Sequence, residues 1–253
     1  MTNKKFKLAA MSLATAVAVS SVGPSASAVT YQLENGDVTV AENENGAFSY
    51  QNTANGKTDD VYVDKDTQDY GQIIIKQAEG TTTDNTVTVE ENVTNKDGDR
   101  DVDIIIDGVN VDTSDTSTQT DTSAEVPADA DAKEDKKTII KVGEGADVDL
   151  TVKDSKLTTG GHGIDIGVDL DGKDGGEDGD KKTNVDLTLD NTQINLTQNG
   201  KAGINVQDNS NVDLTLKDKN TIDGSEAIKK EEDGILTKNV NVEGIRVGDG
   251  GGK

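Results

Sequence analysis

The chain repeats one short alternating segment four times, and this repeat constrains the fold more than any other feature. The copies begin at Val102, Val148, Val185 and Val212, and they align over ten positions without a gap. Positions one, three and five are always Val, Ile or Leu, and position two is always Asp. This alternation has the period of a β-strand with one apolar face. A single copy cannot bury that face, so the pattern predicts a stack of strand-and-turn units.

Two further elements complete the unit. An Asp, Asn or Gly stands at position seven of each copy and predicts a turn, followed by another short strand. An apolar pair with one residue between its members recurs at Ile140, Ile164, Ile204 and Ile245. A unit of roughly 20–25 residues with three short strands is typical of a parallel β-helix. We therefore predict an all-β solenoid over residues 71–253.

The amino-acid composition is consistent with an elongated fold, and the net charge excludes some classes of binding partner. Apolar residues make up 31% of the chain, which suits a thin core better than a thick globular one. The formal net charge of −24 argues against nucleic acid, which needs a basic face, and against docking on anionic lipid. The chain has no cysteine, which excludes disulfides and thiolate chemistry.

Residues 1–28 have the pattern of an export signal. Three lysines precede an apolar run from Leu8 to Val22, and an Ala-Ser-Ala triplet ends at Ala28. This order is that of a secretory signal peptide over residues 1–28, and the run is short for a membrane span of about 20 residues. Export without cysteines is typical of bacteria. We expect a protein that is secreted or held at the cell wall or surface of a Gram-positive bacterium, with no membrane insertion once the signal is removed.

Residues 29–70 differ from the repeats. They hold all five aromatic residues that follow the signal, and Asn-Gly recurs at Asn35, Asn45 and Asn55. Asn-Gly is a strong hairpin signal because a type I′ turn needs two residues with positive φ. We predict a small N-terminal β cap of short antiparallel strands, which covers the first open end of the stack. An aromatic site for stacking sugars is the alternative for the same residues.

Three polar segments interrupt the repeats and are predicted to be loop inserts. They cover residues 113–137, 169–182 and 225–238. The third contains a stretch from Ala227 that suits a helical turn. A separate glycine cluster, Gly160 to Gly163, is predicted to form a corner of the stack with His162 facing solvent.

Calcium is the candidate ion, since hard cations take several oxygen ligands and Asp-rich loops supply them. No other cofactor is expected. The candidate ligands are Asp97, Asp99 and Asp101 in one cluster, and Asp169, Asp171, Asp174, Asp178 and Asp180 in the other. The first cluster matches the first three ligands of an EF-hand loop, but Val102 stands where the loop needs Gly. Both clusters can also be read as solvated acidic loops.

The aspartates at position two of the repeats are expected to form an outward row. This row consists of Asp103, Asp149, Asp186 and Asp213. Their charges are expected to be partly screened by Lys141, Lys153 and Lys217. We assign no catalytic or cofactor-binding residue, because the chain has only two arginines and one histidine and no marked pair of carboxylates.

The whole pattern resembles a known class of module. The segments that carry the resemblance are Val-Asp-Leu-Thr-Leu-Lys-Asp at Val212, Asp-Gly-Val-Asn at Asp107 and Gly-Ile-Asn-Val at Gly203. These resemble the right-handed parallel β-helix repeat modules of secreted bacterial, Firmicutes-type surface proteins, often described as carbohydrate-binding or adhesin-like. The resemblance covers about Ile73 to Val247 and assigns no functional residue.

That resemblance implies right-handed coiling and a non-catalytic, secreted or cell-surface adhesion or glycan-binding module. Its partner would be a polysaccharide or a host or bacterial surface glycan. Two alternatives stay open at this point. One is a polysaccharide lyase or glycoside hydrolase of the β-helix type, because one fold hosts several functions. The other is a structural surface stalk.

Overall fold

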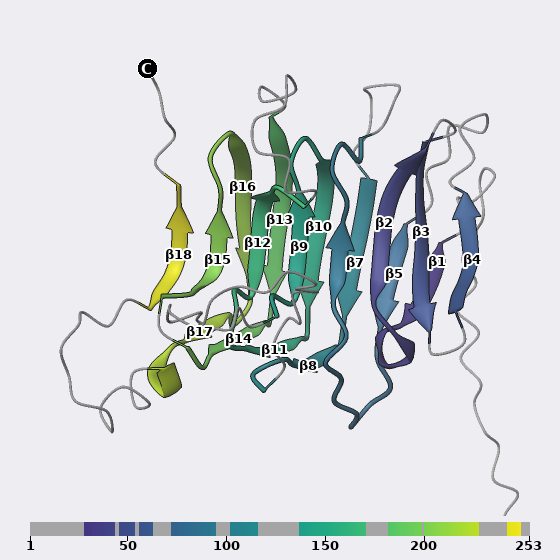
Figure 1. The fold of residues 1–253 in the computed structure, drawn as a ribbon. Helices are drawn as coiled ribbons and strands as arrows, with labels where there is room; N and C mark the ends of the chain where they lie inside the picture. Colours follow the sequence, from purple (N-terminus) through teal and green to yellow (C-terminus); the bar gives the residue numbers. More distant parts are fainter. Residues whose placement is uncertain are drawn as a thin grey trace, which may run out of the picture.

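The structure is a computed structural model, and it describes residues 28–43, 46–53, 56–62, 72–94, 102–115, 137–170, 182–198, 200–227 and 242–248. Their regular secondary structure is almost entirely β-strand, and Figure 1 shows the strands standing side by side in a long row. The prediction of an all-β chain is confirmed. Among the described residues, no helix has the length and apolar character to cross a bilayer.

The strands form three sheets. The six-stranded sheet has the order β1 (Val29–Gln32), β5 (Ile73–Lys76), β7 (Val102–Asp107), β10 (Asp147–Lys153), β13 (Thr183–Asp190), β16 (Ser210–Lys217). The four-stranded sheet has the order β17 (Thr221–Asp223), β14 (Gln193–Leu196), β11 (Lys156–Thr159), β8 (Asn110–Asp112). The eight-stranded sheet has the order β18 (Glu243–Val247), β15 (Ala202–Val206), β12 (Ile164–Val168), β9 (Ile140–Gly143), β6 (Val87–Val89), β2 (Val38–Asn43), β3 (Gly46–Thr53), β4 (Gly56–Tyr62).

The four copies of the repeat lie next to one another in perfect register. Val102, Val148, Val185 and Val212 are adjacent across the parallel pairs β7·β10, β10·β13 and β13·β16. The second element behaves in the same way, because the strands that carry Ile140, Ile164, Ile204 and Ile245 pair in parallel in the eight-stranded sheet. From β7 onward, each strand pairs with the strand three places later in the chain. The repeat is therefore the unit from which the sheets are built.

The turn at position seven is also confirmed. The backbone φ is +69° at Gly108, +48° at Asp154, +49° at Asn191 and +51° at Asp218. The left-handed region costs little for Gly and is best tolerated by Asn and Asp among the other residues. The predicted turn residues therefore occupy the conformation that explains why these three residue types occur there.

The apolar positions of the repeat fill a core shared by all three sheets. Ile104, Leu150 and Leu187 in the six-stranded sheet are fully buried. They belong to one cluster with Leu157 of β11 and Ile164 of β12. Every strand contributes only a few side chains to this core, which accounts for the low apolar content of the chain.

The N-terminal strands join these sheets directly. β1 pairs in parallel with β5, and β2 pairs in parallel with β6. β2 then pairs antiparallel with β3, and β3 with β4, as the Asn-Gly signals at Asn45 and Asn55 predicted. The hairpin predicted at Asn35 is wrong, because β1 and β2 on either side of it lie in different sheets. Between β1 and β2 the chain makes a short 3-10 helix, Leu33–Asn35, whose Leu33 is fully buried.

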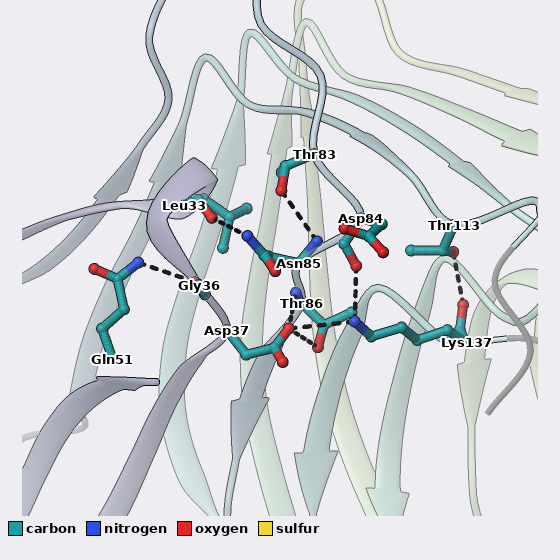
Figure 2. A network of polar contacts seen from close by, with 10 residues as sticks. All are labelled: Leu33, Gly36, Asp37, Gln51, Thr83, Asp84, Asn85, Thr86, Thr113 and Lys137. Carbon is teal, nitrogen blue, oxygen red and sulfur yellow. Dashed lines mark hydrogen bonds and ion pairs between the residues drawn. The ribbon is translucent and has the colours of Figure 1, made fainter. Parts of the chain in front are cut away.

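A polar network ties this N-terminal part to the repeats (Figure 2). Asp37 Oδ1 accepts hydrogen bonds from the backbone N–H of Thr86, at 2.6 Å, and from Lys137 Nζ, at 3.3 Å. Asn85 Nδ2 donates to the carbonyl oxygen of Leu33 at 2.8 Å. These bonds join residues 49 to 100 positions apart, so they fix how the first strands sit against the following ones.

Candidate functional site

Two grooves on the outer surface are the candidate sites, and the first lies on the six-stranded sheet. Its lining has two parallel rows, one of aspartates and one of threonines. Those residues are Asp103, Asp149, Asp186, Asp213, Thr151, Thr188 and Thr215, around a volume of about 310 Å³. Strand pairing places each residue beside its equivalent in the next repeat. The predicted aspartate row is therefore confirmed.

This row brings like charges together. Neighbouring strands in a sheet are about 4.8 Å apart, so each carboxylate has another one nearby. Asp186 and Asp213 are exposed, and water reduces the repulsion between such groups to a small cost. At one end of the row, Gln72 Nε2 donates a hydrogen bond of 2.7 Å to Asp103 Oδ2. The surface is acidic, regular and open to solvent.

Two of the three expected screening lysines lie elsewhere. Lys153 Nζ is 3.2 Å from Asp107 Oδ2, a carboxylate outside the row, and Lys76 Nζ is 3.5 Å from the same atom. Lys141 stands on β9, which belongs to the eight-stranded sheet. The expectation that these two lysines screen the row is wrong, because spacing in the sequence did not reveal which sheet or which carboxylate each one meets.

The second groove follows the corner between the six-stranded and four-stranded sheets, and we call it the corner groove. It encloses about 490 Å³ and is lined by Gly108, Val109, Asn110, Asp154, Ser155, Lys156, Asn191, Thr192, Gln193, Lys219 and Thr221. Register across the four-stranded sheet places Asn110, Lys156, Gln193 and Thr221 in one row. The groove therefore presents a different polar group at each successive strand.

Buried hydroxyl groups hold the backbone of the corner groove. Thr192 Oγ1 donates to the carbonyl oxygen of Val152 at 2.9 Å, and Ser155 Oγ accepts a 3.2 Å hydrogen bond from the backbone N–H of Val109. Both hydroxyl residues are buried, at 1% and 3% exposure. Asn191 Nδ2 also donates to Asp154 Oδ1 at 2.8 Å, which links two successive turns. The groove has a rigid floor.

Two lysines remain free in this groove. Lys156 and Lys219 are exposed, and neither forms an ion pair with a residue that the structure describes. They outnumber the one carboxylate of the lining, Asp154, whose Oδ1 accepts the hydrogen bond from Asn191. The corner groove can therefore offer ammonium, amide and hydroxyl donors to a polar ligand. Sequence reasoning missed it, although the positions that follow each turn residue were visible in the aligned repeats.

Most of the predicted calcium ligands lie outside the described residues. This holds for Asp97, Asp99, Asp101, Asp171, Asp174, Asp178 and Asp180. Asp169 is described and is exposed just after β12. Within the described ranges, no group of three His, Asp or Glu side chains could hold a metal ion. Calcium binding at the two loop clusters stays a prediction.

The single histidine does not face solvent as expected. His162 is half-buried, and its Nδ1 accepts a 3.0 Å hydrogen bond from the backbone N–H of Ala202. Burial lowers the pKa of the imidazole below its ordinary value of 6.5, although the nearby Asp165 carboxylate acts in the opposite direction. The ring is a packed part of the corner, and the contact with Ala202 joins residues 40 positions apart.

The described arginine is away from the aspartate row. Arg246 lies on β18 of the eight-stranded sheet, where its Nε contacts Glu243 Oε2 and its Nη2 donates to the carbonyl oxygen of Gly200 at 3.1 Å. No protein-family model matches the chain, and neither curated proteins nor solved structures produce a match.

Proposed function

We propose that the three sheets close into a right-handed parallel β-helix that serves as a secreted or cell-surface glycan-binding module without catalytic activity. The repeating parallel register of β7, β10, β13 and β16 supports the helical closure. The pattern of a signal peptide over residues 1–28 supports export. The corner groove carries the assignment of glycan binding.

The chemistry of the corner groove suits a carbohydrate. Amide, hydroxyl and ammonium groups donate hydrogen bonds to sugar oxygens, and the row contains one such side chain from each strand. Consecutive strands are spaced by about 4.8 Å, so the groove offers donors at a constant interval. A polysaccharide is also a periodic ligand, and a rigid floor lowers the entropy lost on binding it.

Charge favours a particular class of glycan. Lys156 and Lys219 have no described carboxylate partner, so an anionic group on the sugar would meet them without displacing an existing ion pair. The aspartate row on the neighbouring sheet would repel the same ligand. We therefore propose an acidic polysaccharide, bearing carboxylate or sulfate groups, that follows the corner groove and not the open face of the six-stranded sheet.

A glycan array with the purified protein tests this proposal, followed by titration of each glycan that binds. Lys156→Ala and Gln193→Ala should each weaken binding at least severalfold, because each removes a donor from the row. Thr188→Ala changes the outer face of the six-stranded sheet and should leave binding unchanged. Absence of binding to every acidic glycan, or equal loss with Thr188→Ala, would reject the corner groove as a glycan site.

A structural stalk is the second candidate. Its support is the outer face of the six-stranded sheet, where Asp and Thr repeat without variation over β10, β13 and β16. Such a surface stays hydrated and offers little shape to a ligand. A protein that binds no glycan but holds two domains at a fixed separation would favour this function over glycan binding.

The lyase or hydrolase alternative gains no such support, since Arg246 pairs with Glu243 on a different sheet from the aspartate row.

A further inference from the structure

The last strands of the three sheets leave apolar side chains uncovered. Leu216 is 59% exposed, Ile245 is 48% exposed and Val247 is 69% exposed, and these are the exposed large apolar residues of the described chain. Their register partners one strand earlier are Leu189, Ile204 and Val206, at 1%, 1% and 6%. The same positions are thus buried between two described strands and exposed on the last described strand of each sheet.

This end of the molecule also presents open strand edges. β16, β17 and β18 are each the terminal strand of their sheet, and Figure 1 shows them together at one end of the row. The outer edge of a terminal strand carries N–H and C=O groups that can pair with another strand. Val212, Leu214 and Ile222 on these strands are only partly buried. Among the described residues, these three strands therefore frame an apolar surface that a further strand layer could cover.

The opposite end of the molecule has a different arrangement of strands. The eight-stranded sheet continues past β2 into the antiparallel strands β3 and β4, whereas the six-stranded sheet stops at β1. Gln51 of β3 donates to the carbonyl oxygens of Gln32, at 2.7 Å, and Gly36, at 2.9 Å. The hydroxyl of Tyr31 donates to the carbonyl oxygen of Ser49 at 2.7 Å. This end is uneven, because β1 ends the six-stranded sheet while β3 and β4 extend the eight-stranded sheet, and this argues against head-to-tail stacking of copies.

We propose that the end formed by β16, β17 and β18 is a dimer interface for a second copy of this chain. The two copies of β16 would pair antiparallel about a two-fold axis through Thr215. In an antiparallel pair, residues that face each other point to the same side. Leu214 then lies opposite Leu216 of the second copy, and both leucines point into the joined cores.

The charges on β16 favour this antiparallel pairing over the alternatives. With Thr215 on the axis, Asp213 lies opposite Lys217 of the second copy, twice in the dimer, and opposite charges across a strand pair are favourable. A parallel copy in the register of β13 and β16 would instead extend the aspartate row. An antiparallel pair centred on Asp213 would place the two carboxylates directly together. The closed two-fold arrangement also stops at two copies, so it does not lead to fibres.

The remaining edges fit the same axis. If the three sheets close as proposed above, a two-fold axis through β16 places β17 opposite β18 of the second copy. Ile222 then covers Ile245 and Val247 of the other copy, and these are the remaining exposed apolar residues. This step rests on the proposed helical closure but not on glycan binding. The test of the dimer interface is therefore independent of the test of glycan binding.

Light scattering coupled to size exclusion tests the interface with the purified protein. We expect twice the mass of one chain at high concentration and dissociation on dilution. Asp213→Lys and Lys217→Asp should each return the mass to one chain, because each places like charges opposite one another. The combined variant, D213K with K217D, exchanges the pair and should restore the dimer. Asp186→Lys, the equivalent change one strand inward, is the matched control and should leave the dimer intact.

Three outcomes would overturn the interface. One is the mass of a single chain at every concentration, which would mean that the apolar end is covered within one chain. Another is a series of species that grows with concentration, which would indicate head-to-tail stacking. The third is a dimer that survives both single charge reversals. Leu216→Asp provides a second probe if a reversal impairs folding, as checked by circular dichroism, and it too should leave only single chains.

Discussion

The contrast between two equivalent leucines predicts how the stack is stabilised. Leu189 on β13 and Leu216 on β16 are register partners, but the first is 1% exposed and the second is 59% exposed. Leu189→Ala removes a fully buried side chain and leaves a cavity, which costs about 2–5 kcal/mol in cores of this kind. We expect about 3 kcal/mol, because strands pack against β13 on both sides.

Leu216→Ala should cost much less in a single chain. About two fifths of the Leu216 surface is buried, and complete burial of a leucine stabilises by about 1.5–3 kcal/mol. The expected loss is therefore about 1 kcal/mol. The difference of about 2 kcal/mol between the two variants corresponds to about 4–8 °C in Tm for a protein of this size.

Urea and thermal unfolding followed by circular dichroism measure this difference, at a protein concentration where light scattering finds single chains. The conservative variants Leu189→Met and Leu216→Met are the controls, since they keep most of the side-chain volume. Equal losses for the two alanine variants would refute the reasoning, because the exposed leucine would then be packed as tightly as the buried one.

Three further predictions concern single contacts. Asp37→Ala should reduce the free energy of unfolding, measured by urea titration, by about 1–2 kcal/mol, because it removes charge-assisted hydrogen bonds that join the N-terminal strands to the repeats. Asp84→Ala is the control and should have little effect, because it keeps the backbone carbonyl that Lys137 contacts. Asn191→Ala should lower Tm by a few degrees, because the backbone φ of +49° at this position costs about 1–2 kcal/mol for a residue other than Gly, Asn or Asp. Asn191→Gly should lower Tm less, because Gly adopts this φ at little cost. Because burial lowers the pKa of His162 in the folded protein, the unfolded chain binds its proton more readily, so the contribution of this group to stability is full above pH 6.5 and falls as the pH drops below it. His162→Gln should flatten that part of the curve of unfolding free energy against pH, and an unchanged slope would contradict the assignment.

The repeat could be predicted from the sequence because its signals are local. Alternation at Val148 and Val185 gives the buried face, and the turn residues Asp154 and Asn191 mark where each strand ends. Both signals depend only on neighbouring residues, and the pairing that follows from them is confirmed by the register. The hairpins between β2, β3 and β4 were visible for the same reason, since Asn-Gly is a local turn signal.

The features that escaped prediction depend on contacts between distant residues. β1 and β2 carry no copy of the repeat, so their parallel pairing with β5 and β6 has no signature in the sequence. His162 meets Ala202 from a neighbouring repeat, and its burial follows from that contact. The corner groove arises because different polar residues, such as Lys156 and Gln193, occupy equivalent positions in successive strands. Register is needed before such a row can be recognised.

The parallel register also decides how this protein responds to mechanical load. Hydrogen bonds between neighbouring strands run along the direction in which the strands are stacked, so tension between the two ends of the stack acts on those bonds directly. Each strand is held mainly by its two neighbours, and the terminal strands β16 and β18 are held on one side only. A pulling force should therefore detach strands one after another from the open end, while the network around Asp37 secures the other end. We therefore expect the protein to lengthen stepwise under load, strand by strand, and not to unfold in a single step.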